Sequence, residues 1–441
     1  MNTANAGGAA AQGGAGAASG GRTANVPGRA GGAGGVAATS SGAGASAAVA
    51  GANAAVAGAS ANAAGGAPGA AGQGGVNAGA SGAVASGGTG AGTGADAGSG
   101  GQVAGSSAAG SGEPAAGASA AGTAAAGSGS SVMCTPPAPG TMGRNPLFSD
   151  TFTADPGPMV HDCTFYIYCG HDEGTTGFNI REWYVLSSTD MVTWDKQVVL
   201  DLQAFSWADV NAWAGQAVAK DGKFYWYVPV NERGGGMTIA VAVGDSPTGP
   251  FEDAIGKPLI NDAFEMSNVG FRTPSDTPFT IDPTVFVDDD GQAYLHYGGF
   301  GRMMVAKLGS DMISIEGKLE EVTPRGFFEA PFLTKHDGVY YEIYAAGTNP
   351  ASIDYATSAS PLGPWEYGGR ILDPLPFPPG DDAATSHPGV AELAGQWYLV
   401  YHLSNGPMGG GTYRRQVALE KLTWNPDGSI AKIEPSSGLR F

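Results

Sequence analysis

One pattern of residues recurs five times in the later part of the chain, and it limits the folds that the chain can adopt. Each copy has an apolar strand, a turn, an aromatic strand and a third strand. The clearest copy covers residues 279–297, F-T-I-D-P-T-V-F-V-D-D-D-G-Q-A-Y-L-H-Y, in which Asp-Gly separates two runs rich in β-forming residues. Asp-Gly at this place is a strong hairpin signal. A single such hairpin would be an ordinary surface feature, so the inference depends on the repetition.

The spacing of the copies indicates the kind of repeat. The tyrosines of the five aromatic strands lie 59, 69, 47 and 57 residues apart, at Tyr166, Tyr225, Tyr294, Tyr341 and Tyr398. These distances are close to the length of a four-stranded blade with its loops. Few segments look helical. The pattern therefore predicts an all-β chain that forms a five-bladed β-propeller, with a β-sandwich as the alternative.

The first part of the chain has a different composition. Residues 1–132 are almost entirely Gly, Ala and Ser, contain no aromatic residue, and carry only four charges, at Arg22, Arg29, Asp96 and Glu113. Such a segment cannot bury enough apolar area to offset its chain entropy. We expect a disordered low-complexity tether over residues 1–132, a Pro/Gly-containing linker over residues 133–144, and the propeller domain over residues 145–441.

The charge of the chain restricts its partners. The four tether charges cancel, so the formal net charge of −19 belongs to the expected propeller. This charge disfavours nucleic acid and anionic membranes but not a neutral sugar polymer. No apolar run is long enough to span a membrane, and the start M-N-T-A-N-A-G-G shows no signal peptide. Because a long tether suits a secreted or surface-anchored protein, we expect an extracellular or cell-surface location, with a mis-assigned start or another export route.

The chain contains three cysteines, Cys134, Cys163 and Cys169. Six extended residues span roughly 20 Å, which is too far for a bridge between Cys163 and Cys169. Cys134 can pair with either of them, and a free buried thiol is at least an equal alternative. The spacing matches no zinc-binding pattern.

The residues at the heads of the five copies share one offset. Asp155, Trp213, Asp282, Glu329 and His387 each lie eleven or twelve residues before the tyrosine of their own copy. An equal offset implies an equal position in each blade, and the first strand of every propeller blade lines the central channel. We therefore expect these five side chains to converge on one pocket.

Three carboxylates in one pocket cannot all stay ionised at low cost, so the pKa of at least one should rise. Hydrolysis of a glycosidic bond needs one protonated acid for the leaving oxygen and one base for water. Glu329 is the better candidate acid, because its apolar neighbours F-F-E-A-P-F raise a carboxyl pKa by desolvation. Asp155 and Asp282 have more polar neighbours and are expected to stay anionic. Trp213 offers a surface on which a sugar ring can stack.

Each candidate also has an ordinary structural interpretation. A lone Asp-Pro or Glu-Ala is usually structural, and Trp213 by itself is more often a core residue. For His387, a satisfied core histidine and a ligand of metal or water have about even odds. Arg414-Arg415 would normally be a solvated face, although an arginine near the channel could hold sugar hydroxyls. The common phase of the three carboxylates is what favours catalysis.

Two further acidic segments are secondary candidates. Asp288–Asp290 resembles part of a calcium loop but lacks its length and its closing glutamate, so we interpret it as a turn. Four residues that closely follow the first head are candidates for the rim of the pocket: His161, His171, Asp172 and Glu173.

The motifs T-A-D-P-G-P-M, N-A-W-A, T-I-D-P-T-V-F-V-D-D-D-G-Q-A-Y-L, F-E-A-P-F and S-H-P-G-V resemble, in this order, the blade-head motifs of family 43 of the glycoside hydrolases. The resemblance covers about residues 145–441. It implies a five-bladed propeller and an inverting single displacement. It also implies that Asp155 is the general base, that Glu329 is the general acid, and that Asp282 orients the acid and tunes its pKa.

The resemblance extends to the groups that would bind substrate. It implies that Arg415 in Y-R-R-Q-V contacts the substrate, and that His387 is a channel histidine close to a bound calcium ion or water. Together with Trp213, we expect these residues to bind the sugar. No cofactor is required, although a structural calcium in the channel is compatible with the family. The sequence departs from the family pattern at Ala330, where Gly is common, and at Pro388-Gly389; we expect these changes to affect the shape of the pocket rather than its chemistry.

The first two copies, with S-S-T-D-M-V-T-W and K-F-Y-W-Y-V-P-V, look closest to members that act on arabinoxylan side chains or xylo-oligosaccharides. We therefore expect a monomeric, exo-acting α-L-arabinofuranosidase whose partner is a plant cell-wall polysaccharide. An exo-acting β-xylosidase on xylo-oligosaccharides is the second expectation. A non-catalytic sugar-binding propeller is the alternative from another class of protein.

Overall fold

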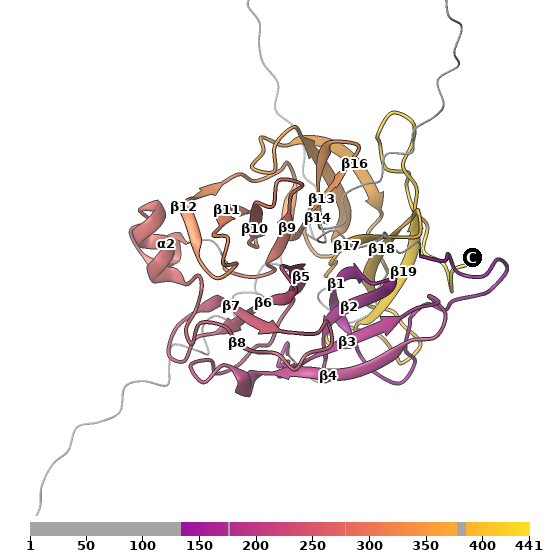
Figure 1. Cartoon of the computed structure of the whole chain (residues 1–441), viewed down its shortest axis with the longest axis horizontal. Coiled ribbons are helices and arrows are strands. Elements are labelled where there is room, and N and C mark those ends of the chain that lie inside the picture. The colour runs from indigo at the N-terminus through magenta and orange to yellow at the C-terminus, as the bar shows by residue number, and fades with distance from the viewer. Residues whose placement is uncertain (1–133, 175–176, 278, 377–384) are drawn as a thin grey trace, which may run out of the picture. The chain divides into compact units, whose positions relative to one another are not determined.

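The structure is a computed structural model that describes residues 134–441 apart from residues 175–176, 278 and 377–384. The tether expected over residues 1–132 lies outside the described residues. Five antiparallel sheets surround a common centre, as Figure 1 shows. The five-bladed propeller predicted from the repeats is confirmed, and the β-sandwich alternative is wrong.

Each blade is a meander whose strands pair in chain order. The first two blades consist of β1 (Ala154–His161), β2 (Thr164–Gly170), β3 (Glu182–Ser188) and β4 (Asp195–Asp201), then β5 (Gln216–Lys220), β6 (Lys223–Asn231), β7 (Met237–Gly244) and β8 (Glu252–Asp253). The third and fourth consist of β9 (Thr284–Val287), β10 (Ala293–Tyr297), β11 (Met304–Leu308) and β12 (Ile315–Glu321), then β13 (Phe327–His336), β14 (Val339–Ala346), β15 (Ser352–Ser358) and β16 (Glu366–Leu372). The fifth has β17 (Gly389–Leu393), β18 (Gln396–Leu403) and β19 (Gln416–Leu422).

Helices are few in the described part of the chain and lie between strands. They are η1 (Leu202–Ala204), α2 (Asp262–Val269) and η2 (Pro274–Asp276). Asn261 caps α2 by accepting the N–H of Phe264 at 3.0 Å, and Gly270 ends it in the left-handed conformation. None of the helices in residues 134–441, outside the gaps named above, has the length and apolar character needed to cross a membrane.

The first strand of every blade lies at the centre of the ring. β1 contacts β5, β5 contacts β9, β9 contacts β13, β13 contacts β17, and β17 contacts β1 again, and Figure 1 shows these five strands around the axis. This arrangement follows from the alternating pattern of the strands, because each sheet must bury one face against the next. It brings the strand heads, which are far apart in sequence, to one end of one channel.

The hydrophobic core lies between neighbouring blades. Each interface has its own cluster of buried side chains: Trp183 and Trp226 between the first and second blades, Tyr227 and Tyr297 between the second and third, Val305 and Tyr344 between the third and fourth, Ile343 and Leu399 between the fourth and fifth, and Phe165 and Val400 between the fifth and first. Complete burial of such a side chain contributes roughly 1.5–3 kcal/mol relative to exposure. The aromatic strands therefore supply much of the attraction that keeps the blades together.

The segment before the first blade closes the ring. The N–H of Leu147 donates to the carbonyl of Val417 in β19 at 2.9 Å, and the N–H groups of Gly143 and Gly140 donate to Leu439 and Phe441 at 2.9 and 2.8 Å. Gly140 and Gly143, which the sequence assigned to a linker, are thus hydrogen-bonded to residues 439–441, while Leu147 joins the start of the propeller to β19.

A disulfide settles the pairing that the sequence left open. It joins Cys134 to Cys163, whose Cα atoms are 5.1 Å apart, and it fastens the segment before the propeller to the turn between β1 and β2. Cys169 is a buried free thiol.

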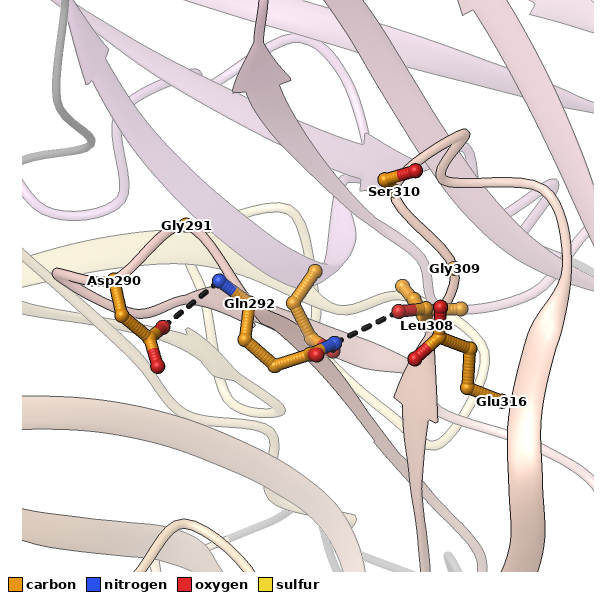
Figure 2. Close-up of a pocket in the computed structure, with 8 residues that line it drawn as sticks. Asp290, Gly291, Gln292, Leu308, Gly309, Ser310 and Glu316 are labelled. Carbon is orange, nitrogen blue, oxygen red and sulfur yellow. Dashed lines mark hydrogen bonds between the residues drawn. The ribbon is translucent and has the colours of Figure 1, made fainter.

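The acidic segment Asp288–Asp290 is a turn, as expected. It joins β9 to β10 at the opposite end of β9 from Asp282. The Asp288 carboxylate accepts hydrogen bonds from Lys335 Nζ at 2.7 Å and from Tyr340 Oη at 2.5 Å. Beside the turn is a hollow of about 280 Å³, shown in Figure 2, in which Gln292 Nε2 donates to the carbonyl of Leu308 at 2.8 Å. The Asp290 carboxylate accepts the N–H of Gln292 at 2.9 Å, so these two lining side chains stabilise the turn.

Candidate active site

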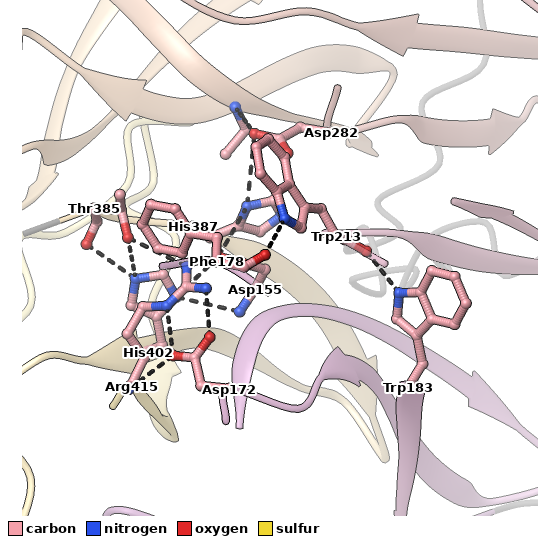
Figure 3. A network of polar contacts seen from close by, with 11 residues as sticks. Asp155, Asp172, Phe178, Trp183, Trp213, Asp282, Thr385, His387, His402 and Arg415 are labelled. Carbon is pink, nitrogen blue, oxygen red and sulfur yellow. Dashed lines mark hydrogen bonds and ion pairs between the residues drawn. The ribbon is translucent and has the colours of Figure 1, made fainter. Parts of the chain in front are cut away.

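The five predicted strand heads occupy equivalent places. Asp155 is the second residue of β1, and Glu329 is the third residue of β13. Trp213, Asp282 and His387 lie three, two and two residues before β5, β9 and β17. His387 Nδ1 is 3.8 Å from Asp155 Oδ1 and 3.9 Å from Asp282 Oδ2. Residues from the first, third and fifth blades therefore meet at one point in the channel, as Figure 3 shows.

The backbone turns these carboxylates toward the channel. Asp155 and Asp282 have φ values of 53° and 54°, and Ala330, directly after Glu329, has a φ of 57°. The pairing of β1 with β2 and of β13 with β14 shifts register at these places. A bulge re-aims a side chain that would otherwise follow the alternation of the strand. The left-handed conformation at Ala330 explains why Gly is common there in the family pattern, since it costs an L-residue roughly 1–2 kcal/mol.

Asp155 is held by a buried arginine. Arg415 Nη1 donates to Asp155 Oδ1 at 2.6 Å, while Nε and Nη2 of the same guanidinium donate to the two oxygens of Asp172 at 2.9 and 2.8 Å. Burial alone would raise the pKa of Asp155, but the charge of Arg415 and the two histidines beside it lower that pKa below its ordinary value of 3.8. The carboxylate of Asp155 is therefore anionic at neutral pH, as the sequence predicted.

His402 is a second histidine in the site, and sequence reasoning missed it. The N–H of Asp155 donates to His402 Nδ1 at 3.2 Å, and His402 Nε2 lies 2.9 Å from the carbonyl of Thr385. A ring nitrogen that accepts an N–H carries no proton, so this network assigns the proton to Nε2. Burial lowers the pKa of both His402 and His387 to about 4. Both rings are thus neutral at neutral pH.

The environment of Glu329 differs from that of Asp155. The Glu329 carboxyl group makes no hydrogen bond or ion pair with any residue that the structure describes, and its side chain is only partly exposed. Burial, followed by the charge of Asp155, raises the pKa of Glu329 to about 8. A proton is therefore retained near neutral pH on the residue that the sequence selected as the acid.

The protonation state of Asp282 differs from the one expected. The sequence predicted that it stays anionic, as Asp155 does, but burial and the charges of Glu329 and Asp155 raise its pKa well above 3.8. Only the N–H of Ala330, which donates to Asp282 Oδ2 at 3.0 Å, and the charge of Arg415 act in the other direction. The charge of Glu329 is one of the causes that raise the pKa of Asp282, so the two carboxyl groups compete for protons as a pair.

Trp213 is fixed in the channel wall. Its Nε1 donates to the carbonyl of Phe178 at 2.7 Å, and its own carbonyl accepts Trp183 Nε1 at 2.6 Å. Its ring lies 6.0 Å from that of Phe178 and 6.1 Å from that of Phe279. Phe178 also lies under the guanidinium of Arg415, at 4.9 Å from the ring centroid. Trp213 is half-buried and belongs to an aromatic wall rather than to the core alone.

The structure places two of the four rim candidates, Asp172 and His161, elsewhere, and the place of His171 at the rim stays a prediction. Asp172 is buried, with 1% of its surface exposed, as the partner of Arg415. His171 pairs with Glu182 at 2.8 Å. His161 lies at the other end of β1 from Asp155, and its ring packs against Phe224. Glu173 is exposed, and its place at the rim stays a prediction.

Arg415 has little contact with solvent. Only 3% of its surface is exposed, and it also donates to Thr385 Oγ1 at 3.3 Å. Four of the five N–H groups of the guanidinium are thus used by Asp155, Asp172 and Thr385. Holding Asp155 is the role that this geometry shows, and contact with substrate stays a prediction.

The described residues of the channel contain no ready-made cluster of metal ligands. Among the residues that the structure describes, no three or more His, Cys, Asp or Glu side chains are arranged to hold a metal ion. Calcium takes six to eight oxygen ligands, whereas the Asp155 carboxylate is bonded to Arg415 and that of Asp282 to a backbone N–H. The described side chains thus supply no protein ligand set for calcium, so a channel calcium stays a prediction and no chemical step is assigned to one.

Comparison with known proteins identifies the family. The model for glycosyl hydrolases family 43 matches residues 144–430. The chain belongs to this family. A xylosidase/arabinosidase of Humicola insolens is 30% identical over 357 residues, which cover 66% of this chain and 99% of the relative.

Solved structures agree with this assignment. A family 43 β-xylosidase/α-arabinofuranosidase from a compost microbial metagenome, solved with xylotriose in a calcium-free form, has a TM-score of 0.57 and 31% identity, covering 66% of this chain and 97% of that chain. An α-L-arabinofuranosidase of Clostridium thermocellum has a TM-score of 0.55 and 35% identity, covering 67% and 98%. This family 43 chain is therefore a glycosidase of the xylosidase/arabinosidase type.

Proposed function

We propose that the protein is an inverting, exo-acting glycoside hydrolase that releases terminal α-L-arabinofuranosyl residues from arabinoxylan or related plant polysaccharides. The observation that carries the proposal is the contrast within one channel. Asp155 is bonded to Arg415 and has a lowered pKa, whereas Glu329 has no such partner and a pKa of about 8. One base and one acid at neutral pH are what a single displacement at an anomeric carbon needs.

In the proposed reaction, Asp155 accepts a proton from a water molecule while the water oxygen attacks the anomeric carbon. Glu329 donates its proton to the glycosidic oxygen as the bond from that oxygen to the anomeric carbon breaks. The products are a free sugar of inverted configuration and a shortened chain. Asp155 then loses a proton to solvent and Glu329 gains one, which restores both groups. Asp282 acts through Glu329: its bond to the N–H of Ala330, the next residue, fixes the position of the acid. We infer that Asp282 also tunes the pKa of the acid as the neighbour with which Glu329 shares protons.

Three further residues have proposed roles in binding. Trp213 stacks against the sugar that is released, since its ring is held by Phe178 and Phe279. His387 lies between Asp155 and Asp282, and as a neutral ring it can hydrogen-bond a sugar hydroxyl. Arg415 supports Asp155 and has one N–H group left for substrate.

The sugar released is the finer part of the proposal. Arabinofuranose is favoured by the Clostridium thermocellum α-L-arabinofuranosidase, which has the higher sequence identity of the two solved structures compared above, at 35% against 31%. The second candidate is an exo-acting β-xylosidase on xylo-oligosaccharides, favoured by the compost enzyme whose structure contains xylotriose. A screen of purified protein on arabinoxylan, arabinan, xylobiose and the two p-nitrophenyl glycosides separates them. Arabinose as the main product supports the first candidate, and xylose from xylobiose supports the second.

A non-catalytic sugar-binding propeller is tested by the same screen. Glu329→Gln should lower turnover of arabinoxylan by about 10²–10⁴-fold, because it removes the general acid. The loss should be smaller on p-nitrophenyl glycosides, whose leaving group needs little protonation. The matched control is Glu366→Gln, at an exposed position in the outermost strand β16. Sugar binding without turnover in the wild-type protein would refute the hydrolase.

The stereochemistry gives an independent test. We expect the carboxyl groups of Asp155 and Glu329 to lie roughly 6.5–9.5 Å apart, which leaves room for the attacking water. Proton NMR of the first product formed from a glycoside should show the inverted anomer. Retention of configuration would remove Asp155 from the role of base.

We further propose that the protein works outside the cell or on its surface, as a monomer. The disulfide between Cys134 and Cys163 fits an oxidising compartment. Mass spectrometry of the native protein from cell fractions, together with light scattering, tests both statements. Recovery from the cytoplasmic fraction with Cys134 reduced would contradict the location.

A further inference from the structure

Phe300 is an exposed aromatic residue in a strained conformation. Its surface is 55% exposed and its φ is 52°. A bulky residue in the left-handed region is a conformational outlier that costs roughly 1–3 kcal/mol. Burial does little to offset this cost, because more than half of the surface of the residue stays exposed. An outlier of this kind calls for a functional explanation.

The turn that carries Phe300 is bonded to the heads of two catalytic blades. The N–H of Gly298 donates to the carbonyl of Ile281 at 2.8 Å, and the N–H of Gly301 donates to the carbonyl of Phe328 at 2.9 Å. Ile281 directly precedes Asp282, and Phe328 directly precedes Glu329. The position of the Phe300 ring is therefore coupled to the two strand heads that supply the proposed acid and its neighbour.

Phe300 ends a row of aromatic rings that leads away from the site. Its ring lies 5.0 Å from that of Phe279 and 5.7 Å from that of Phe328. Phe279 contacts Trp213, and Trp213 contacts Phe178 beside Arg415. The row thus runs from the Asp155 side of the channel to the Glu329 side and becomes exposed only at Phe300.

We propose that Phe300 is the stacking platform for the sugar unit on the leaving-group side of the scissile bond, a neutral pyranose ring of a xylan-type chain. This inference rests on the proposed hydrolase. The general acid protonates the leaving oxygen, so the sugar next to Glu329 that extends away from Asp155 is the leaving group. The C–H face of a pyranose ring can pack on an aromatic face, and the absence of charge on both suits a platform with no ionic partner.

The first test compares two leaving groups. The value of kcat/KM is measured for an arabinosylated xylotriose (or for xylobiose, if that is the substrate) and for the corresponding glycosyl fluoride. The ratio of the first value to the second should fall about tenfold in Phe300→Ala. Fluoride carries no ring that could use the platform. The matched control is Tyr367→Ala, another exposed aromatic residue, which lies in the outermost strand β16 and should leave the ratio unchanged. An unchanged ratio in Phe300→Ala overturns the proposal, including the case in which both substrates lose activity equally.

The second test separates this inference from the proposed function. Calorimetric titration of the Glu329→Gln variant with xylotriose and with xylose measures binding without turnover. Adding Phe300→Ala should weaken xylotriose binding about tenfold more than xylose binding. If the wild-type protein hydrolyses none of the glycosides, the hydrolase fails, yet this titration still decides whether Phe300 binds a second sugar ring. Equal affinities with and without Phe300, or a dimer that Phe300→Ala dissociates in light scattering, overturn the platform.

Discussion

The carboxyl groups of Asp155 and Glu329 come from the inner strands of the first and fourth blades, but they lie in opposite electrostatic surroundings. Asp155 receives a charged hydrogen bond from Arg415, which Asp172 holds in place on its other edge. Glu329 receives no hydrogen bond from the described residues and adjoins Phe328 and Ala330. The pKa is lowered in the first case and raised to about 8 in the second.

The comparison separates what the fold determines from what the neighbouring residues determine. The repeat of the propeller places both groups at the end of one channel. The residues packed around each group decide which one holds a proton. A substitution can therefore remove the chemistry while leaving the fold intact, or weaken the fold by changing the charges that support the chemistry.

The largest effect should come from Asp155→Asn. The amide cannot accept a proton from water, so kcat should fall about 10³–10⁴-fold on every substrate, whatever its leaving group. Steady-state kinetics on arabinoxylan and on p-nitrophenyl glycosides measures this. Asp162→Asn, an exposed position in the turn after β1, is the control and should keep wild-type rates. A loss confined to poor leaving groups would instead assign the role of acid to Asp155.

Asp172→Asn should lower the stability of the protein, because it removes a buried partner of Arg415. Removing one carboxylate from a buried, hydrogen-bonded charge network costs about 3 kcal/mol of unfolding free energy. Urea unfolding at pH 7 gives the value. Asp373→Asn removes an ion pair with Lys432 at the surface and should change stability little. Equal stability of the two variants would show that Asp172 does not support Arg415.

Removing the charge of Glu329 should raise the unfolding free energy, whereas removing that of Asp172 lowers it. Because the folded protein raises the pKa of Glu329 from 4.5 to about 8, the stabilising effect of its neutral form is complete below pH 4.5 and is lost as the pH rises to 8. Glu329→Gln stays neutral, so it should gain roughly 1.4 kcal/mol over the wild type for each pH unit between pH 5 and pH 8. Thermal unfolding at several pH values tests this. A constant difference across that range would contradict the raised pKa.

The smallest effect concerns the backbone beside Glu329. Ala330→Gly relieves the left-handed conformation and should raise the unfolding free energy by up to about 1 kcal/mol. Ala345→Gly, in β14 opposite Glu329, has no such strain and should lower stability instead. Denaturant midpoints of the two variants should move in opposite directions. A decrease in both would show that φ at Ala330 is not a source of strain.

The sequence predicted the features that depend on local pattern. Strand alternation and hairpin turns are short-range signals, so the five blades and the common phase of Asp155, Asp282 and Glu329 could be found without a structure. The Arg415–Asp172 pair could not, because its members lie 243 residues apart and no local pattern joins them. His402 was missed because a histidine in an aromatic strand looks like a core residue. The raised pKa of Asp282 was missed because it depends on neighbours that only folding brings close.

The central claim is that Glu329 holds a proton at neutral pH while Asp155 does not. It is tested most directly by following the side-chain carboxyl carbons by NMR in protein labelled at Glu and Asp, with Glu329→Gln and Asp155→Asn used to assign the two signals. The account predicts that the Glu329 signal titrates at about pH 8 and that the Asp155 signal is still that of a carboxylate at pH 4.5. A Glu329 signal that titrates near its ordinary value of 4.5 would contradict it.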